Sequence, residues 1–245
     1  MNLILIEPAD IQSDGTARIG GPQAEHIRNV LKSSPGHQLR VGVIDGPAGT
    51  ATITTVADRY IEVTCALDPE PPPRPGIDLL LALPRPKVMR RLWAQLAALG
   101  VGRIILTNAE RVERDYFDTH ILQPETYRPL LIEGLQQARD TRLPIVTIHK
   151  RFKVLIEDEL DALCPQRHRL VAHPQETTAG EETTPDVVSG GRTLLAIGPE
   201  GGWNAFELQL LEAHGFRRIS LGARSLRTDT ACIAMLAVVK TFFRP

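Results

Sequence analysis

The residues with the clearest chemical potential lie in two short loops near the C-terminal end of the chain. In the first loop, Glu200 stands between glycines in Gly198-Pro199-Glu200-Gly201-Gly202-Trp203, directly after an apolar run. Glycines leave backbone amides uncovered, and a carboxylate between them has no obvious packing role. A tight connection from a strand to a helix is the alternative explanation. We interpret Glu200 as a group that faces a cationic ligand or accepts a substrate proton.

The second loop carries two arginines ahead of a predicted helix. Thr228 is a plausible N-cap, and Asp229 suits the positive end of a helix dipole. Arg224 and Arg227 do not suit that end, so they favour an anionic partner such as a phosphate or a carboxylate. A salt bridge to Asp229 or Glu200 is the alternative.

Basic side chains also share one face of a predicted helix. Lys87, Arg90 and Arg91 fall at positions i, i+3 and i+4, and Arg85 precedes them. Such a run is usually a solvated helix face, but beside the arginine loop it indicates contacts with a phosphate backbone. Aromatic residues are only 4% of the chain, which favours recognition of structured RNA by backbone and shape over base stacking.

A sheet must position these loops. After the first 76 residues, strands alternate with helices, which predicts an α/β domain with a largely parallel sheet. Such sheets bind ligands at the carboxyl ends of their strands, where both glycine loops should lie beside each other. The expected strands are Ile77–Leu83, Arg103–Thr107, Ile145–His149, Arg169–Ala172, Thr193–Ile197 and Arg218–Leu221. The expected helices are Lys87–Leu99, Thr126–Arg139, Ala205–His214 and Asp229–Phe243. Asn204 and Glu207 have the spacing of a capping box, and Pro174–Gly191 is expected to be a surface loop.

The N-terminal part has a different pattern. A proline-rich stretch indicates a semi-rigid linker at residues 71–76, between a domain at 1–70 and a domain at 77–245. The first domain is expected to be small, β-rich and barrel-like. Its predicted strands are Leu3–Ile6, Gln38–Ile44, Ala51–Val56 and Tyr60–Ala66, with one helix at Gln23–Lys32 that buries His26.

Composition narrows the class of protein. Hydrophobic residues make up 42% and charged residues 23% of the 245 residues, and the net charge is −1, as in a soluble globular protein. No apolar run is long enough for a membrane span, and the start does not resemble a signal peptide. Three widely spaced cysteines argue against a disulfide framework and favour a reducing cytoplasm, with Cys232 packed inside a helix. The histidines lack metal-ligand spacing, so no metal site is expected, and nucleotide-binding and serine hydrolase motifs are absent.

Together, the two loops resemble the signature of the 16S ribosomal RNA uracil-N3 methyltransferase family of the SPOUT superfamily. The matching residues are Ile197–Gly202 with Glu207, followed by Leu221-Gly222-x-Arg224-x-Leu226-Arg227-Thr228-x-Thr230-Ala231. Agreement extends to His26–Lys32, Leu99–Val101, Gln137 with Arg142, and His173-Pro174. Members carry a lysine and a glutamate where Gln95 and Ala98 stand here, and an arginine in place of Asp140. These changes affect the surface expected to meet RNA.

The resemblance implies a SPOUT-type trefoil-knotted, mostly parallel sheet with helices on both faces, and a small N-terminal PUA-like β-barrel that binds RNA. It implies a cytoplasmic homodimer that binds S-adenosyl-L-methionine and acts on 16S ribosomal RNA of the small subunit. The cofactor-binding residues would be Ala172, His173, Ile197, Gly198, Pro199, Glu200, Gly201, Gly202, Leu221, Gly222, Arg224 and Leu226. The RNA-binding residues would be Arg28, Lys32, Arg85, Lys87, Arg90, Arg91 and Arg142.

The chemistry implied is removal of the uracil N3 proton and in-line methyl transfer. We expect Arg227 to stabilise the developing uracil anion or a neighbouring phosphate, and Asp229 or Glu200 to accept the proton. Two other functions remain open. One is methylation of another RNA or of a small molecule, and the other is a non-catalytic RNA-binding factor in ribosome assembly.

Overall fold

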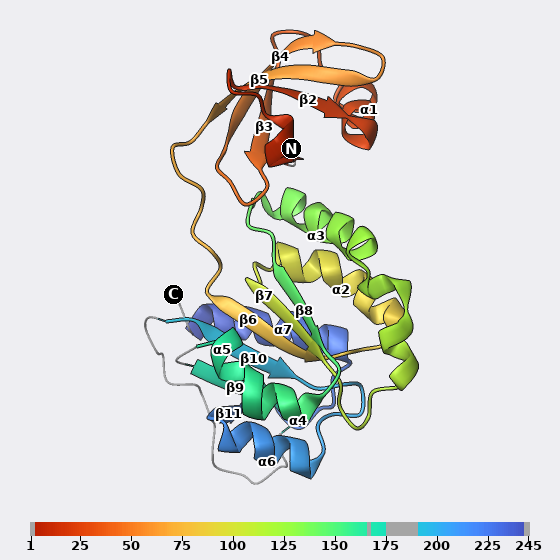
Figure 1. The fold of residues 1–245 in the computed structure, drawn as a ribbon, viewed down its shortest axis with the longest axis vertical. Coiled ribbons are helices and arrows are strands. Elements are labelled where there is room, and N and C mark those ends of the chain that lie inside the picture. The colour runs from red at the N-terminus through yellow and green to blue at the C-terminus, as the bar shows by residue number, and fades with distance from the viewer. Residues whose placement is uncertain (1–2, 166–167, 175–190, 243–245) are drawn as a thin grey trace. The chain divides into compact units, whose positions relative to one another are not determined.

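The computed structural model describes residues 3–165, 168–174 and 191–242 (Figure 1). Most of the predicted surface loop Pro174–Gly191 therefore lies outside the described residues. The chain divides into two compact units, Met1–Arg74 with Ile132–Leu143, and Pro75–Leu131 with Pro144–Pro245. Within the described part of the chain, no helix combines the length and apolar character needed to cross a membrane.

The first unit is built on a five-stranded sheet in the order β1-β3-β4-β5-β2. The pair β1–β3 is parallel and the other pairs are antiparallel. The elements are β1 (Ile4–Ile6), β2 (Thr16–Gly20), α1 (Gly21–Asn29), β3 (Gln38–Val43), β4 (Ala48–Val56) and β5 (Tyr60–Leu67), with a short 3-10 turn at Pro8–Asp10. The four predicted strands and the helix are present, and β2 is an additional strand.

The interior of this unit is apolar and extends to one face of α1. Ala24 and Ile27 of α1 join a cluster that includes Ile53 and Ile61. The prediction that His26 is buried is wrong, because Ala24 and Ile27 point into the sheet and His26 lies on the exposed side of the helix.

The returning segment Ile132–Leu143 completes the first unit. The Leu3 amide donates to the Gln136 carbonyl at 3.0 Å, and the Thr141 hydroxyl donates to the Gly46 carbonyl at 2.6 Å. A side chain at Gly42 would collide with the methyl group of Thr141, at 2.5 Å from the position of its Cβ. The N-terminal sheet is thus closed on one side by a distant part of the sequence.

The second unit contains a six-stranded sheet in the order β11-β9-β10-β6-β7-β8, and every pair is parallel. Its strands are β6 (Ile77–Ala82), β7 (Arg103–Thr107), β8 (Ile145–His149), β9 (His168–Ala172), β10 (Thr193–Ile197) and β11 (Phe216–Ile219). All six predicted strands are therefore present. Every residue of β6 and β10 is buried, as expected for a parallel sheet covered on both faces.

The helices of this unit flank the sheet. They are α2 (Pro86–Ala98), the first part of α3 (Pro124–Ala138), α4 (Phe152–Val154), α5 (Leu160–Leu163), α6 (Ala205–Ala213) and α7 (Thr228–Phe242), with a π-helical turn at Leu155–Glu159 and 3-10 turns at Arg114–Asp118 and His120–Leu122. Figure 1 shows α7 on one side of the sheet and α4 and α5 on the other. The segment that includes α4 and α5 was not predicted, because short helical pieces give little periodic signal.

Candidate functional site

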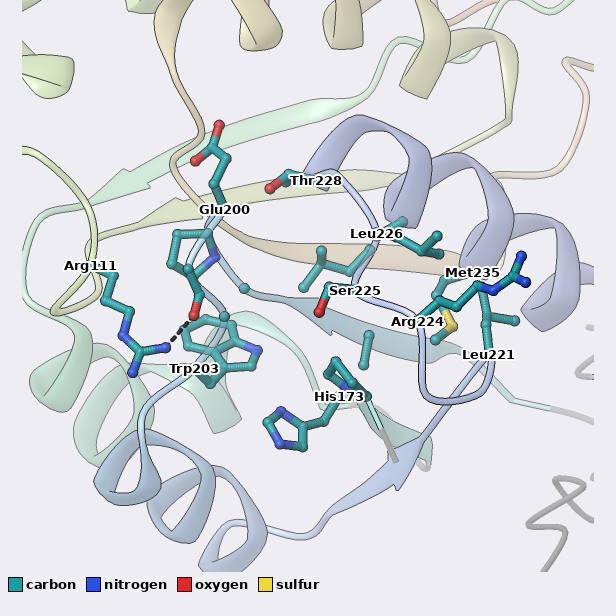
Figure 2. Close-up of a pocket in the computed structure, with 18 of the residues that line it drawn as sticks. Arg111, His173, Glu200, Trp203, Leu221, Arg224, Ser225, Leu226, Thr228 and Met235 are labelled. Carbon is teal, nitrogen blue, oxygen red and sulfur yellow. Dashed lines mark hydrogen bonds between the residues drawn. The ribbon is translucent and has the colours of Figure 1, made fainter. Parts of the chain in front are cut away.

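One pocket lies at the carboxyl edge of the parallel sheet, where the chain leaves β9, β10 and β11 (Figure 2). All twelve predicted cofactor-binding residues line it: Ala172, His173, Ile197, Gly198, Pro199, Glu200, Gly201, Gly202, Leu221, Gly222, Arg224 and Leu226. The two glycine loops do not follow neighbouring strands, because β9 lies between β10 and β11. The loop after β9 therefore forms part of the wall between them.

Several lining residues were not predicted: Arg111, Pro174, Trp203, Ser225, Thr228, Ala231 and Met235. Arg111 is the most distant in sequence, and its guanidinium donates to the Gly201 carbonyl (Figure 2). No local pattern marks Arg111 as a pocket residue, since it becomes one only when β7 and β10 enter the same sheet. Ala231 and Met235 line the pocket together with Thr228, the first residue of α7, because helix positions three or four apart lie on the same face of the helix.

The loop after β10 is shaped around Trp203. A Cβ at Gly198 would lie 3.1 Å from the Trp203 amide nitrogen and 3.2 Å from its indole ring, closer than an ordinary contact, so a larger residue would push the ring or the loop aside. The ring is buried and contacts Phe152, with ring centroids 5.3 Å apart. Its Nε1 has no hydrogen-bond partner among the described residues. This leaves a buried N–H donor in the pocket wall.

The predicted capping box holds the far end of this loop. The Asn204 side chain accepts the Glu207 amide at 2.8 Å, and the Glu207 carboxylate accepts the Asn204 amide at 2.8 Å. The other carboxylate oxygen of Glu207 accepts the Glu110 amide at 2.7 Å. Glu207 is only 3% exposed, so these bonds tie the start of α6 to the loop after β7.

Glu200 lies at an exposed position in the pocket wall. Its Oε1 accepts the backbone N–H of Arg85, the residue before α2, at 3.2 Å. This bond joins the loop after β10 to the beginning of α2. Because the residue is exposed, its carboxylate stays accessible to a ligand beside the bond to the Arg85 amide.

Asp229 and Arg227 do not line the pocket, although Thr228 between them does. Asp229 accepts a hydrogen bond from the Arg91 guanidinium at 2.7 Å, which holds the pKa of its carboxyl below the usual value. Arg227 is 76% exposed, and its Nε lies 3.9 Å from Asp229. The salt bridge considered for Arg227 thus exists only as a loose contact.

Thr228 does not cap α7 as predicted. It is the first helical residue, it is 3% exposed, and its hydroxyl has no hydrogen-bond partner among the described residues. The first turn is instead closed by Asp229, whose carboxylate accepts the Thr230 amide at 3.0 Å. A capping role therefore does not explain the Thr228 hydroxyl.

The predicted RNA-binding residues fall into two groups. In the second unit, Arg85, Lys87 and Arg90 are exposed at and after the start of α2, whereas Arg91 pairs with Asp229.

In the first unit, Lys32 is exposed, but two arginines are bonded to backbone carbonyls. Arg28 donates to the carbonyls of Ala57 and Asp58, and Arg142 donates to those of Asp45 and Pro72. The guanidinium groups of Arg28 and Arg142 therefore hold loops of this unit in place.

The fold and the glycine-lined pocket at the edge of a parallel sheet are those of an α/β protein that binds an organic ligand. Residues 70–240 match the family model of the RNA methyltransferase domain, and the chain therefore belongs to this family. Within it, the chain is similar to the ribosomal RNA small subunit methyltransferase E of Treponema pallidum, at 31% identity over 98% of this chain and 90% of that protein. It is also similar to the ribosomal RNA small subunit methyltransferase E 1 of Borreliella burgdorferi, at 24% identity over 96% and 95% of the two chains.

A solved structure shares the complete fold. It is the ribosomal RNA small subunit methyltransferase E of Neisseria gonorrhoeae bound to S-adenosyl methionine, with a TM-score of 0.77 and 22% identity over 99% of this chain and 98% of that chain. This likeness confirms the α/β fold that was predicted from the strand and helix pattern.

Proposed function

We propose that this chain transfers a methyl group from S-adenosyl-L-methionine to N3 of a uracil in 16S ribosomal RNA of the small subunit. The observation that carries the proposal is that the loop after β10 and the loop after β11, which together resemble the family signature, line one pocket. The names of the relatives from T. pallidum and B. burgdorferi support the RNA substrate, and the bound S-adenosyl methionine of the N. gonorrhoeae structure supports the cofactor.

The pocket has the chemical groups that this cofactor needs. Ile197, Leu221 and Met235 provide an apolar wall, and the glycines of the loop after β10 leave backbone amides uncovered. The unpartnered Nε1–H of Trp203 is a donor that a bound ligand can satisfy. The cofactor supplies an electrophilic methyl group on a sulfonium. The carboxylate of Glu200 would lie in the same pocket as that positive charge.

The residues of this chain would orient the base and remove its proton. Glu200 is the better proton acceptor of the two candidates, because it is accessible, whereas Asp229 is bonded to Arg91 and its pKa is lowered. Arg227 would stabilise the developing uracil anion or a neighbouring phosphate from its exposed position beside the pocket. Arg111 would hold the loop by its bond to Gly201.

The RNA surface would include the exposed basic residues of α2. We infer that Arg85, Lys87 and Arg90 contact phosphates, and that Lys32 contributes from the first unit. Arg28, Arg91 and Arg142 would act on RNA only indirectly, since their guanidinium groups bind other parts of the chain.

The resemblance supports several finer features. We infer that residues 1–70 form a PUA-like barrel that binds RNA and that is completed by the returning segment Ile132–Leu143. We infer that 71–76 act as a linker, and that the rest of 77–245 forms a SPOUT domain whose cofactor loops belong to a trefoil knot. We also infer a cytoplasmic homodimer in which each site is completed by its partner subunit. The five-stranded sheet of the first unit and the parallel sheet of the second are consistent with these inferences.

The decisive experiment offers the purified protein two substrates, small ribosomal subunits from a strain that lacks the corresponding gene and total tRNA. With methyl-labelled S-adenosyl-L-methionine, we expect one methyl group on one uracil of 16S RNA, located by mass spectrometry of RNA fragments. Label only in tRNA would contradict the proposal in favour of another RNA target. Calorimetry that detects no cofactor binding would favour the non-catalytic assembly factor.

A further inference from the structure

The hydroxyl of Thr228 is a buried polar group that the folded chain does not use. Its oxygen is shielded from solvent and has no hydrogen-bond partner among the described residues, although the residue lines the pocket. A buried hydroxyl without a partner lowers the stability of the fold, because it has lost its hydrogen bonds to water. The fold gains nothing from such a hydroxyl, so a hydrogen bond to a bound ligand is the explanation that we consider.

The position of Thr228 adds an electrostatic property. It opens α7, a helix of 15 residues, and the first amides of a helix have no acceptor within the helix. The Thr230 amide donates to the Asp229 carboxylate and the Ala231 amide to the Arg227 carbonyl, which leaves the amides of Thr228 and Asp229. Together with the helix dipole, these amides favour negative charge at this end. The negative charge of Asp229 does not cancel this effect fully, since its carboxylate is bonded to the Arg91 guanidinium. The hydroxyl and the helix end therefore form a donor site for an oxygen that carries negative charge.

An acceptor occupies the same end of the pocket. Figure 2 shows the side chains of Glu200 and Thr228 at one end, with the Thr228 hydroxyl directed to the side on which Glu200 lies. The chain around the start of α2 contacts both segments, because the Arg85 amide just before the helix donates to Glu200 and the Arg91 guanidinium in its second turn donates to Asp229. A carboxylate acceptor and a hydroxyl donor thus lie at the same end of the pocket.

This pair of groups matches one edge of uracil. At that edge the N3–H is a donor and the two flanking carbonyl oxygens are acceptors, and these oxygens gain negative charge when the proton leaves. A free carboxylate, such as that of the cofactor, fits the same end poorly because Glu200 would repel it. Cytosine also fits poorly, since its N3 has no proton to donate to Glu200.

We propose that Thr228 is a catalytic residue that donates its hydroxyl to a carbonyl oxygen beside N3, while Glu200 accepts the N3 proton. The inference rests on the proposed function and deepens it. In the step, the N3–H bond breaks and the proton moves to Glu200, and the N3 electron pair forms a bond to the methyl carbon. The carbon–sulfur bond breaks, its electron pair remains on sulfur, and Glu200 later releases the proton to water.

The test compares Thr228→Val with Thr228→Ser. Valine has nearly the shape of threonine without the hydroxyl, and serine keeps the hydroxyl. We expect Thr228→Val to lower kcat for methylation of small subunits by about 10-fold or more, and Thr228→Ser to stay within about fivefold of the wild type. The Kd for S-adenosyl-L-methionine should change by less than about twofold in both variants. The Tm of Thr228→Val should equal or exceed that of the wild type, because an unpaired buried hydroxyl has been removed.

Three results would overturn the inference. Unchanged kcat in Thr228→Val would mean that the hydroxyl does not contact the reacting base. Cofactor binding weakened by the same factor as turnover would assign the hydroxyl to the cofactor. A lowered Tm would assign it to the fold. Each result requires an active wild-type enzyme, whereas failure of the proposed function would appear as a wild type that does not methylate uracil.

Discussion

The guanidinium of Arg91 on α2 binds the carboxylate of Asp229 in the first turn of α7 at 2.7 Å. This bond joins two helices that are far apart in the sequence, of which α7 lines the pocket and α2 begins next to Glu200. It also lowers the pKa of Asp229, which makes that carboxylate a weak base and supports the proposal that Glu200 accepts the proton.

The Arg91–Asp229 pair should contribute to stability in a pH-dependent way. The pKa of Asp229 is lowered in the folded state, so its contribution is present above the unfolded pKa of about 3.9 and is lost as the pH falls through the folded pKa. Arg91 is 46% exposed, which limits the contribution to about 0.5–1 kcal/mol. In urea unfolding, Asp229→Asn should be less stable than the wild type at pH 7 and equal to it near pH 2. An equal difference at both values would contradict this explanation.

Replacing Arg227 by alanine should separate catalysis from cofactor binding. Arg227 is 76% exposed and makes only a loose contact with Asp229, so its loss should leave the fold and the pocket intact. We expect turnover to fall by about 100-fold and the Kd for S-adenosyl-L-methionine to stay within about twofold. Arg217→Ala, which removes an exposed arginine on β11, is the matched control. A large loss of cofactor affinity in Arg227→Ala would indicate a structural role.

The exposed face of α2 should account for part of the salt dependence of RNA binding. Lys87→Ala and Arg90→Ala should each reduce the slope of log affinity against log salt concentration by about one. Filter binding with fragments of 16S RNA between low and moderate salt measures this slope. Arg217→Ala again serves as the control, and a slope equal to that of the wild type in both α2 variants would exclude this face from the RNA contact.

The capping box should be necessary for a stable α6. Asn204→Ala removes one cap acceptor and should lower the free energy of unfolding by about 1 kcal/mol. Glu207→Ala should cost more, because it leaves the amides of Asn204 and Glu110 without their acceptor. Urea unfolding at neutral pH gives both values. If Asn204→Ala proved the more damaging change, the bond from Glu110 would be unimportant.

Local patterns in the sequence predicted the strands of the parallel sheet, and the residues named in the two glycine loops line one pocket. Strands such as Thr193–Ile197 are short apolar runs bounded by glycine, and helix starts such as Asn204 carry their own capping signal. The strand β2 was missed because its five residues include Gly20 and only two buried side chains. His26 was misplaced because an apolar face had to be assigned to α1 without knowledge of the sheet beneath it.

Features that depend on tertiary contacts could not be predicted. Arg111 reaches Gly201 only because β7 and β10 belong to the same sheet. The partners of Asp229 and Arg142 likewise lie far away in the sequence, at Arg91 and at the carbonyl of Asp45. The types of these residues indicated charge and hydrogen-bonding capacity, but not whether that capacity would be used by RNA or by the protein itself.

The return of Ile132–Leu143 to the N-terminal sheet limits how the first unit can be exchanged between proteins. A single recombination event at the proline-rich stretch cannot exchange the complete N-terminal unit. The segment that contains Gln136 and Thr141 belongs to this unit but follows some 60 residues later in the sequence, between two parts of the other unit. A transplant that keeps these contacts must therefore bring both stretches of the sequence.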